Sequence, residues 1–154
     1  DDAVKTLRGV ATALQSATPS EKQKMTLLVR AEALAIQSMI GAGDTSRADR
    51  AIAKLEARGK AGIAVAQAAA RNGRAELLLA KNEKLEETTY LLAQAKIQNF
   101  AAVAEMPRTC SLLGLAHLKL PNAKDRAKSY FEELRARYPE TAEAVLAREQ
   151  LKQL

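Results

Sequence analysis

The sequence predicts an all-α fold, and its length and composition both support that prediction. The chain has 154 residues, which suits one domain that buries its own core. Only 3% of the residues are aromatic, whereas Ala, Leu, Glu, Lys and Arg are abundant and runs of Val, Ile and Thr are few. Sheets favour β-branched and aromatic residues, and the residues that dominate here favour helices. The many alanines would also let helices approach one another closely.

Four prolines mark where helices are expected to begin, because the missing N–H of proline costs nothing in a first helical turn. They are Pro19, Pro107, Pro121 and Pro139. Before the first of them, apolar residues at helical spacing predict an amphipathic helix over residues 3–17. Thr18 and Glu21 have the spacing of a capping box, which predicts a second helix that runs to about Ile40. From Leu27 onward this helix is apolar on most of its circumference, so we expect it to be sandwiched between neighbours.

Glycines and short polar residues delimit the next expected helices. Gly41 can end the second helix, and Ser46 can cap a third helix that continues to Arg58. An alanine-rich helix is expected over residues 61–71, with Asn72-Gly73 as its C-terminal cap. Five more helices are expected, which makes about nine in all, over residues 74–84, 87–104, 108–120, 122–137 and 140–153.

The charge distribution argues against nucleic acid as a partner. The net charge is +6, yet no block of five or more like charges occurs, so there is no basic tail. The stacking aromatics and the motifs typical of nucleic-acid binding are also missing. No apolar run approaches the ~18–20 residues that a membrane-spanning helix needs. The chain begins at Asp1-Asp2, which suggests processing, so a targeting segment can lie outside this sequence.

The sequence offers no candidate for catalysis, for a metal or for another cofactor. A catalytic cysteine needs a base, but the single cysteine, Cys110, and the single histidine, His117, lie seven residues apart on one expected helix. Cys110 stands in an apolar run, so we expect a small buried thiol. Clusters of metal-ligating residues are also missing. We therefore expect a non-enzymatic protein, and the lone cysteine leaves its compartment open.

A short pattern near the C-terminus organises the rest of the chain. Ala127, Phe131 and Leu134 lie on one helical face, and Pro139 follows them. The alanine and the proline of this pattern recur 32 residues earlier, and a weaker match of alanines lies 34 residues before that. Periods of this length indicate helix–turn–helix repeats, in which each unit needs its neighbours to cover its apolar face.

Residues 108–139 resemble a tetratricopeptide repeat. The positions that carry the resemblance are Leu113-Gly114 and His117 in the first helix, and Ala127, Phe131 and Pro139 in the second. The resemblance implies a right-handed stack of antiparallel helix pairs, which makes residues 1–154 a single helical-repeat domain. Its expected parts are an N-terminal helix pair, three repeat-like units and a capping helix, over residues 1–41, 42–73, 74–107, 108–139 and 140–154.

A scaffold of this kind is expected to act through its concave surface, which the first helix of each pair mainly lines. Carrying the groove positions of the family over to this sequence gives ten candidate partner-binding residues: Arg47, Arg50, Lys54, Lys81, Lys84, Arg108, Ser111, Leu115, Leu118 and Lys119. Such a groove is basic and would suit an acidic peptide or a C-terminal carboxylate. The same lysines and arginines can equally be ordinary solvent-facing residues of amphipathic helices.

The resemblance therefore implies a scaffold or adaptor that binds a protein or peptide partner. Residues 127–141 are also similar to repeats of bacterial envelope proteins, including outer-membrane assembly lipoproteins and cell-division coordinators, which favours a periplasmic or envelope-associated protein over a cytoplasmic one. The alternative function is a structural module for homo-oligomerisation, in which the helix over residues 19–40 or the last helix packs against another copy. Sedimentation at several concentrations separates the two functions.

Overall fold

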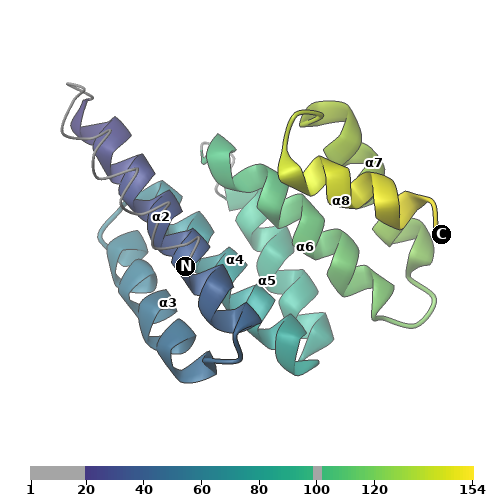
Figure 1. Ribbon diagram of the computed structural model, residues 1–154, viewed down its shortest axis with the longest axis horizontal. Helices are drawn as coiled ribbons and strands as arrows, with labels where there is room; N and C mark the ends of the chain where they lie inside the picture. The colour runs from purple at the N-terminus through teal and green to yellow at the C-terminus, as the bar shows by residue number, and fades with distance from the viewer. Residues whose placement is uncertain (1–19, 99–101) are drawn as a thin grey trace.

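The computed structural model describes residues 20–98 and 102–154, and all regular secondary structure in these ranges is helical (Figure 1). The elements, in chain order, are α2 (Glu21–Gly41), α3 (Thr45–Lys60), α4 (Ala64–Lys81), α5 (Leu85–Gln98), the 3₁₀ turn η1 (Val103–Glu105), α6 (Met106–Leu118), α7 (Lys124–Arg137) and α8 (Ala142–Leu151). The predicted all-α class is confirmed. The described residues form seven α-helices, however, and not about nine.

The difference in helix number has two causes. The predicted helix over residues 3–17 lies outside the described residues. The predicted helices over residues 61–71 and 74–84 are one continuous helix, α4. As a consequence, the boundary predicted between two repeat-like units at residues 73 and 74 falls inside a helix.

The predicted cap at Asn72-Gly73 is wrong because Gly73 serves close packing inside α4. A Cβ atom at this position would lie 3.1 Å from Cγ1 of Ile52 on α3 and 3.3 Å from Cγ2 of Ile36 on α2. Both Asn72 and Gly73 are buried in the helix interior. The loss of ~1 kcal/mol that glycine causes in a helix is therefore offset by the close contact of three helices.

Helices α2 and α3 begin where a side chain accepts from a first-turn N–H group, at positions shifted from those predicted. At the start of α2, the N–H of Gln23 donates to Oγ of Ser20 (3.3 Å) and the N–H of Ser20 donates to Oε1 of Gln23 (2.8 Å). This capping box replaces the one predicted to begin at Thr18, which lies outside the described residues. Asp44, and not Ser46, caps α3 by accepting a hydrogen bond from a first-turn N–H (3.1 Å).

One of the four prolines has its predicted place, in the first turn of a helix. This is Pro107, the second residue of α6. Pro121 lies in the turn before α7, and Pro139 precedes Thr141, whose side chain caps α8. The prediction was wrong for these two because the fixed φ of proline suits turns as well as first helical turns. Pro19 lies outside the described residues.

The helices pack in sequence order, and the core is divided along them. Each α-helix contacts the next one along the chain, and α2, α4, α6 and α8 also contact one another in succession. Buried apolar residues form three clusters, contributed by α2–α4, by α4–α6 and by α6–α8. Within the described residues, α2 and α6 both pack against α4 but not against each other, and α4 lies behind the space between them (Figure 1).

Ion pairs between helices engage several basic side chains. They join Arg58 to Glu32, Arg74 to Asp49 and Glu56, Lys96 to Glu133, and Arg108 to Glu76. Each pair links two different helices, and the basic members are about one-third exposed or less. These charges therefore support helix packing and do not contribute to an open basic surface.

Cys110 is buried on α6, which confirms the predicted buried thiol. Burial raises the pKa of this thiol to about 11. Cys110 is therefore a protonated thiol at neutral pH and lacks the nucleophilic thiolate form.

Candidate functional site

A groove lies between α2 and α6, and α4 forms its floor. Its volume is about 400 Å³, within the range of ~300–1,000 Å³ that ligand pockets occupy. Most of its lining is apolar. The lining residues are Gln37, Ile40 and Gly41 of α2, Glu76, Leu79 and Ala80 of α4, Arg108, Leu112, Leu115 and Leu118 of α6, and Lys119, which caps α6.

The α6 wall of the groove follows from residue spacing. Arg108, Leu112, Leu115 and Lys119 recur at intervals of four, three and four, so they lie along one face of the helix. Leu112 is buried, whereas Leu115 is only partly buried. The leucines thus belong to the core on one side and to the groove on the other.

Small residues keep the groove open at the C-terminal ends of α2 and α4. Gly41 is the last residue of α2, and no atom lies within 4 Å of the position that a Cβ atom would take there. Ala80 is exposed in the last turn of α4. Neither residue places a bulky side chain in the groove, so apolar groups of a partner can reach the leucines.

Charged side chains lie at both ends of the α6 wall. At one end, Arg108 forms an ion pair with Glu76 of α4. At the other end, Nζ of Lys119 donates to the backbone oxygen of Leu79 (3.0 Å) and to Oδ1 of Asn82 (3.2 Å). Asn82 ends α4 in the left-handed conformation, with φ 54°. Lys119 therefore lies where the dipole of α4 favours a cation.

Six of the ten predicted partner-binding residues lie outside this groove or below its surface. Ser111 is fully buried in α6. Lys81 and Lys84 are exposed at and just beyond the end of α4, where Lys84 pairs with Glu87 at 3.1 Å. Four predicted residues meet in the groove: Arg108, Leu115, Leu118 and Lys119.

The three predicted residues on α3 do not face the groove. Arg47, Arg50 and Lys54 are exposed, and Arg47 pairs with Asp44 at 3.5 Å. In the described part of the chain, α3 contacts α2 and α4 but not α6. The cations of α3 and α6 were predicted to share one surface, and the structure does not bring them together.

Sequence reasoning missed the α2 wall and the floor of the groove. The main residues there are Gln37 and Gly41 on α2, and Glu76 and Ala80 on α4. Each pair is spaced four residues apart, as on α6, so the periodic signal was present. It could not be interpreted without knowing that α4 is one long helix flanked by α2 and α6.

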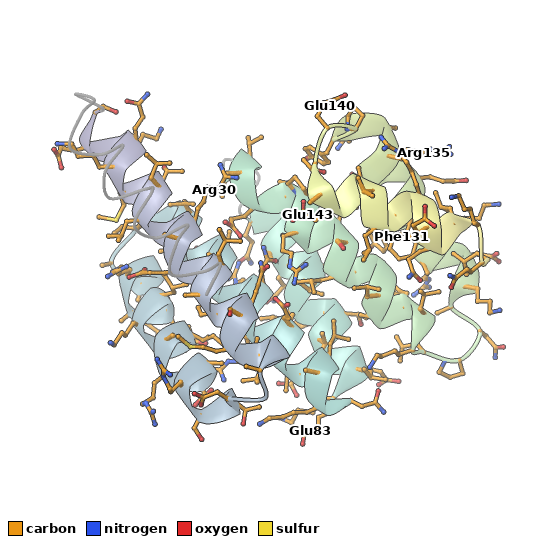
Figure 2. All side chains as sticks on the ribbon, in the orientation of Figure 1. Arg30, Glu83, Phe131, Arg135, Glu140 and Glu143 are labelled. Atoms are coloured by element: carbon orange, nitrogen blue, oxygen red, sulfur yellow. The ribbon has the colours of Figure 1, made fainter. Side chains whose placement is uncertain are left out.

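A buried polar cluster ties α4 to the start of α6, next to Arg108. Nδ2 of Asn72 donates to the backbone oxygen (3.2 Å) and to Oε2 (3.1 Å) of Glu105, and Oγ1 of Thr109 donates to Oδ1 of Asn72 (2.9 Å). Burial raises the pKa of Glu105, although the Asn72 hydrogen bond and the charge of Arg30 act in the opposite direction. Arg30 on α2 and Glu143 on α8, both labelled in Figure 2, act on this pKa in opposite directions, since the negative charge of Glu143 raises it.

Replacing Glu105 by glutamine is expected to raise the melting temperature at pH 7.5 and to leave it nearly unchanged at pH 3.5. A carboxyl group whose pKa rises on folding binds more protons in the folded chain than in the unfolded chain, so its contribution to stability falls as pH rises through the folded pKa. Below the unfolded value of ~4.3 the group is protonated in both states. Thermal melts followed by circular dichroism test this. A lower melting temperature of Glu105→Gln at pH 7.5 would show that the charged form is favoured.

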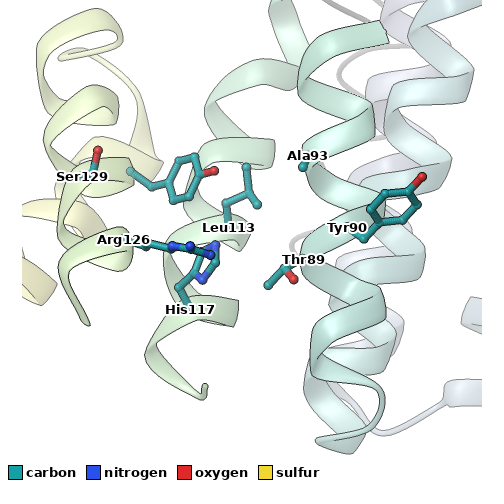
Figure 3. A pocket seen from close by; sticks show the side chains of 8 residues that line it. Thr89, Tyr90, Ala93, Leu113, His117, Arg126 and Ser129 are labelled. Atoms are coloured by element: carbon teal, nitrogen blue, oxygen red, sulfur yellow. The ribbon is translucent and has the colours of Figure 1, made fainter. Parts of the chain in front are cut away.

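A second hollow, of about 450 Å³, lies between α5 and α7 on the other side of α6 (Figure 3). His117 of α6 stacks on Tyr130 of α7, with ring centroids 5.5 Å apart and planes 9° apart. Burial and the charge of Arg126 lower the pKa of His117, so its imidazole is neutral at physiological pH. Tyr90 lines the hollow but points away from α6 (Figure 3). The ring of His117 thus packs between α6 and α7.

No group of three or more His, Cys, Asp or Glu residues in residues 20–98 and 102–154 could hold a metal ion. The same ranges hold no helix with the length and apolar character to span a membrane. Comparison of the chain with protein families, with characterised proteins and with solved structures found no match.

Proposed function

We propose that this chain is a non-enzymatic scaffold that binds a peptide or a protein segment in the groove between α2 and α6. The observation that carries the proposal is an open, mostly apolar groove in which Leu115 and Leu118 are only partly buried. Concave apolar surfaces with a few polar groups at their edges are where ligands commonly bind. Lys119, at the end of the groove where no carboxylate of the described residues pairs with it, favours a partner with an acidic residue.

We also propose that the helices form a right-handed stack of antiparallel pairs, as the resemblance to tetratricopeptide repeats implies. The pairs would be α2–α3, α4–α5 and α6–α7, with α8 as the capping helix. The three apolar clusters support this arrangement, because each is completed by the next pair. The first helices begin at Glu21, Ala64, Met106 and Ala142, which are 43, 42 and 36 residues apart. These spacings exceed the predicted period, so the proposed pairs replace the predicted unit boundaries.

Replacing Ala80 by phenylalanine is expected to weaken peptide binding at least about tenfold, or ~1.4 kcal/mol. Ala80 is exposed in the groove, so the larger side chain would fill the groove without entering the core. Random peptides of about 16 residues, or ~24 Å as a helix, are displayed on phage and selected on the full chain. The selected peptides are then titrated by fluorescence anisotropy.

The matched control is Ala53→Phe, because Ala53 is also an exposed alanine within a helix but lies on α3. It is expected to change the affinity less than about twofold, or ~0.4 kcal/mol. Both variants should keep the wild-type melting temperature. A selection that yields no peptide sensitive to Ala80→Phe would overturn the proposed groove.

Self-association is a second candidate function, because α2 and α8 expose apolar side chains. They are Leu27, Leu28 and Leu34 on α2, and Val145 and Leu146 on α8. α2 is thus less enclosed by the described residues than the sandwiched helix that was predicted. Exposed apolar stripes of this kind are typical of protein–protein contact surfaces. Sedimentation velocity at several concentrations tests this candidate, and a monomer at every concentration would contradict it.

A further inference from the structure

The polar groups of the groove are largely occupied, which limits the conformation that a bound peptide can adopt. Its walls and floor are α-helices, whose interior backbone N–H and C=O groups bond within each helix. Of its polar side chains, Arg108 and Glu76 pair with each other, and Lys119 donates to α4 and the residue that caps it. Gln37 is the main remaining polar side chain of the lining.

An extended peptide would fit this lining poorly. It carries one N–H and one C=O group per residue, and burying these groups without partners is costly. An α-helix satisfies the same groups internally and presents only side chains to its surroundings. The apolar lining of Leu79, Leu112, Leu115 and Leu118 therefore favours a helix with an apolar face.

The charges at the two ends of the α6 wall are not equivalent. The charge of Arg108 is balanced by Glu76, whereas Lys119 is held by a backbone carbonyl and an amide oxygen, which are neutral acceptors. The C-terminal end of α4 offsets the charge of Lys119 only in part, so the larger net positive charge of the groove lies at the Lys119 end. A partner carboxylate at this end would complement it.

We propose that the groove binds an amphipathic α-helix of a partner protein, with apolar residues at positions i, i+3 or i+4, and i+7, and with an acidic residue at the end that meets Lys119. Arg108 on α6 and Lys119, the residue that caps α6, are eleven positions apart, which corresponds to ~16 Å, or about three helical turns. This is the length of helix that the groove accommodates. The inference rests on the proposed function, since it specifies the ligand of the same groove.

The test uses the phage-selected peptides that Ala80→Phe weakens. Their apolar residues are expected to follow helical spacing. Proline at a central position that faces solvent is expected to weaken binding at least about thirtyfold, because proline breaks a helix. Binding should also raise the helical signal in circular dichroism. The reference is alanine at the same position, which should keep or improve the affinity.

The acidic residue is tested by a double-mutant cycle. Changing the peptide carboxylate to its amide is expected to weaken binding to the wild-type chain about threefold to tenfold, and to have little effect with Lys119→Gln. If the amide variant of the peptide loses the same affinity for the wild-type chain and for Lys119→Gln, Lys119 is not the partner of the peptide carboxylate. Peptides with alternating apolar residues that tolerate the proline would overturn the helical ligand while leaving the groove as a binding site. A selection without groove-binding peptides would overturn both the proposed function and this inference.

Discussion

Replacing Phe131 by alanine is expected to lower the free energy of unfolding by about 3–5 kcal/mol. Phe131 is 0% exposed and is the largest fully buried side chain of the described residues. It belongs to the apolar cluster that α6, α7 and α8 share (Figure 2). Removing the ring would leave a cavity where α6, α7 and α8 meet. Each of these helices is held by its other contacts, so they cannot move together to fill the cavity.

Urea unfolding followed by circular dichroism measures this loss for Phe131→Ala. The control is Tyr90→Ala, because the Tyr90 side chain is 66% exposed and is expected to contribute less than about 1 kcal/mol. The transition can split into two steps, since a cluster formed by the last three helices can unfold before the others. A loss of less than about 1 kcal/mol for Phe131→Ala would contradict the packing described for this cluster.

Replacing Gly114 by alanine is expected to lower the free energy of unfolding by about 1–3 kcal/mol. Gly114 lies inside α6, where alanine would by itself add ~1 kcal/mol to helix stability. However, its Cβ atom would lie 2.4 Å from Cε1 and 2.6 Å from Cζ of Phe131. The ring is enclosed by α7 and α8 and cannot move aside, so the steric cost outweighs the helical preference.

The coupling between Gly114 and Phe131 distinguishes this steric explanation from a general helix effect. In a Phe131→Leu background, the smaller side chain leaves space for the methyl group, so Gly114→Ala should become neutral or stabilising. Gly41→Ala is the control, since a Cβ atom there has no neighbour within 4 Å. Gly114→Ala would contradict the close contact with Phe131 if it stabilised the wild-type chain by the full ~1 kcal/mol by which alanine favours a helix over glycine.

The C-terminal helices could be predicted well from the sequence because local and tertiary signals agree there. Pro107 lies in the first turn of α6, and Ala127, Phe131 and Leu134 are all buried on α7. The Leu-Gly and aromatic positions that suggested a repeat also meet in space, since Gly114 lies against Phe131. The spacing of apolar residues predicts a helix reliably where that helix buries one face and has clear start and stop signals at its ends.

The sequence was less informative where a local signal competes with tertiary packing. Asn72-Gly73 has the form of a helix end, yet the contact of Gly73 with Ile36 and Ile52 keeps α4 continuous. This contact depends on α2 and α3, which are distant in sequence, so local reasoning could not detect it. The missed α2 and α4 parts of the groove, such as Gln37 and Ala80, follow from the same cause.

The chemical shifts of the backbone amides, measured with and without a selected peptide, test the proposed groove most directly. Binding between α2 and α6 predicts that the largest changes fall on residues that line the groove: Gln37 and Gly41 of α2, Ala80 of α4, Leu115 of α6, and Lys119 at the end of α6. Changes confined to α3, or to the hollow between α5 and α7, would place the binding surface elsewhere and contradict the proposed function.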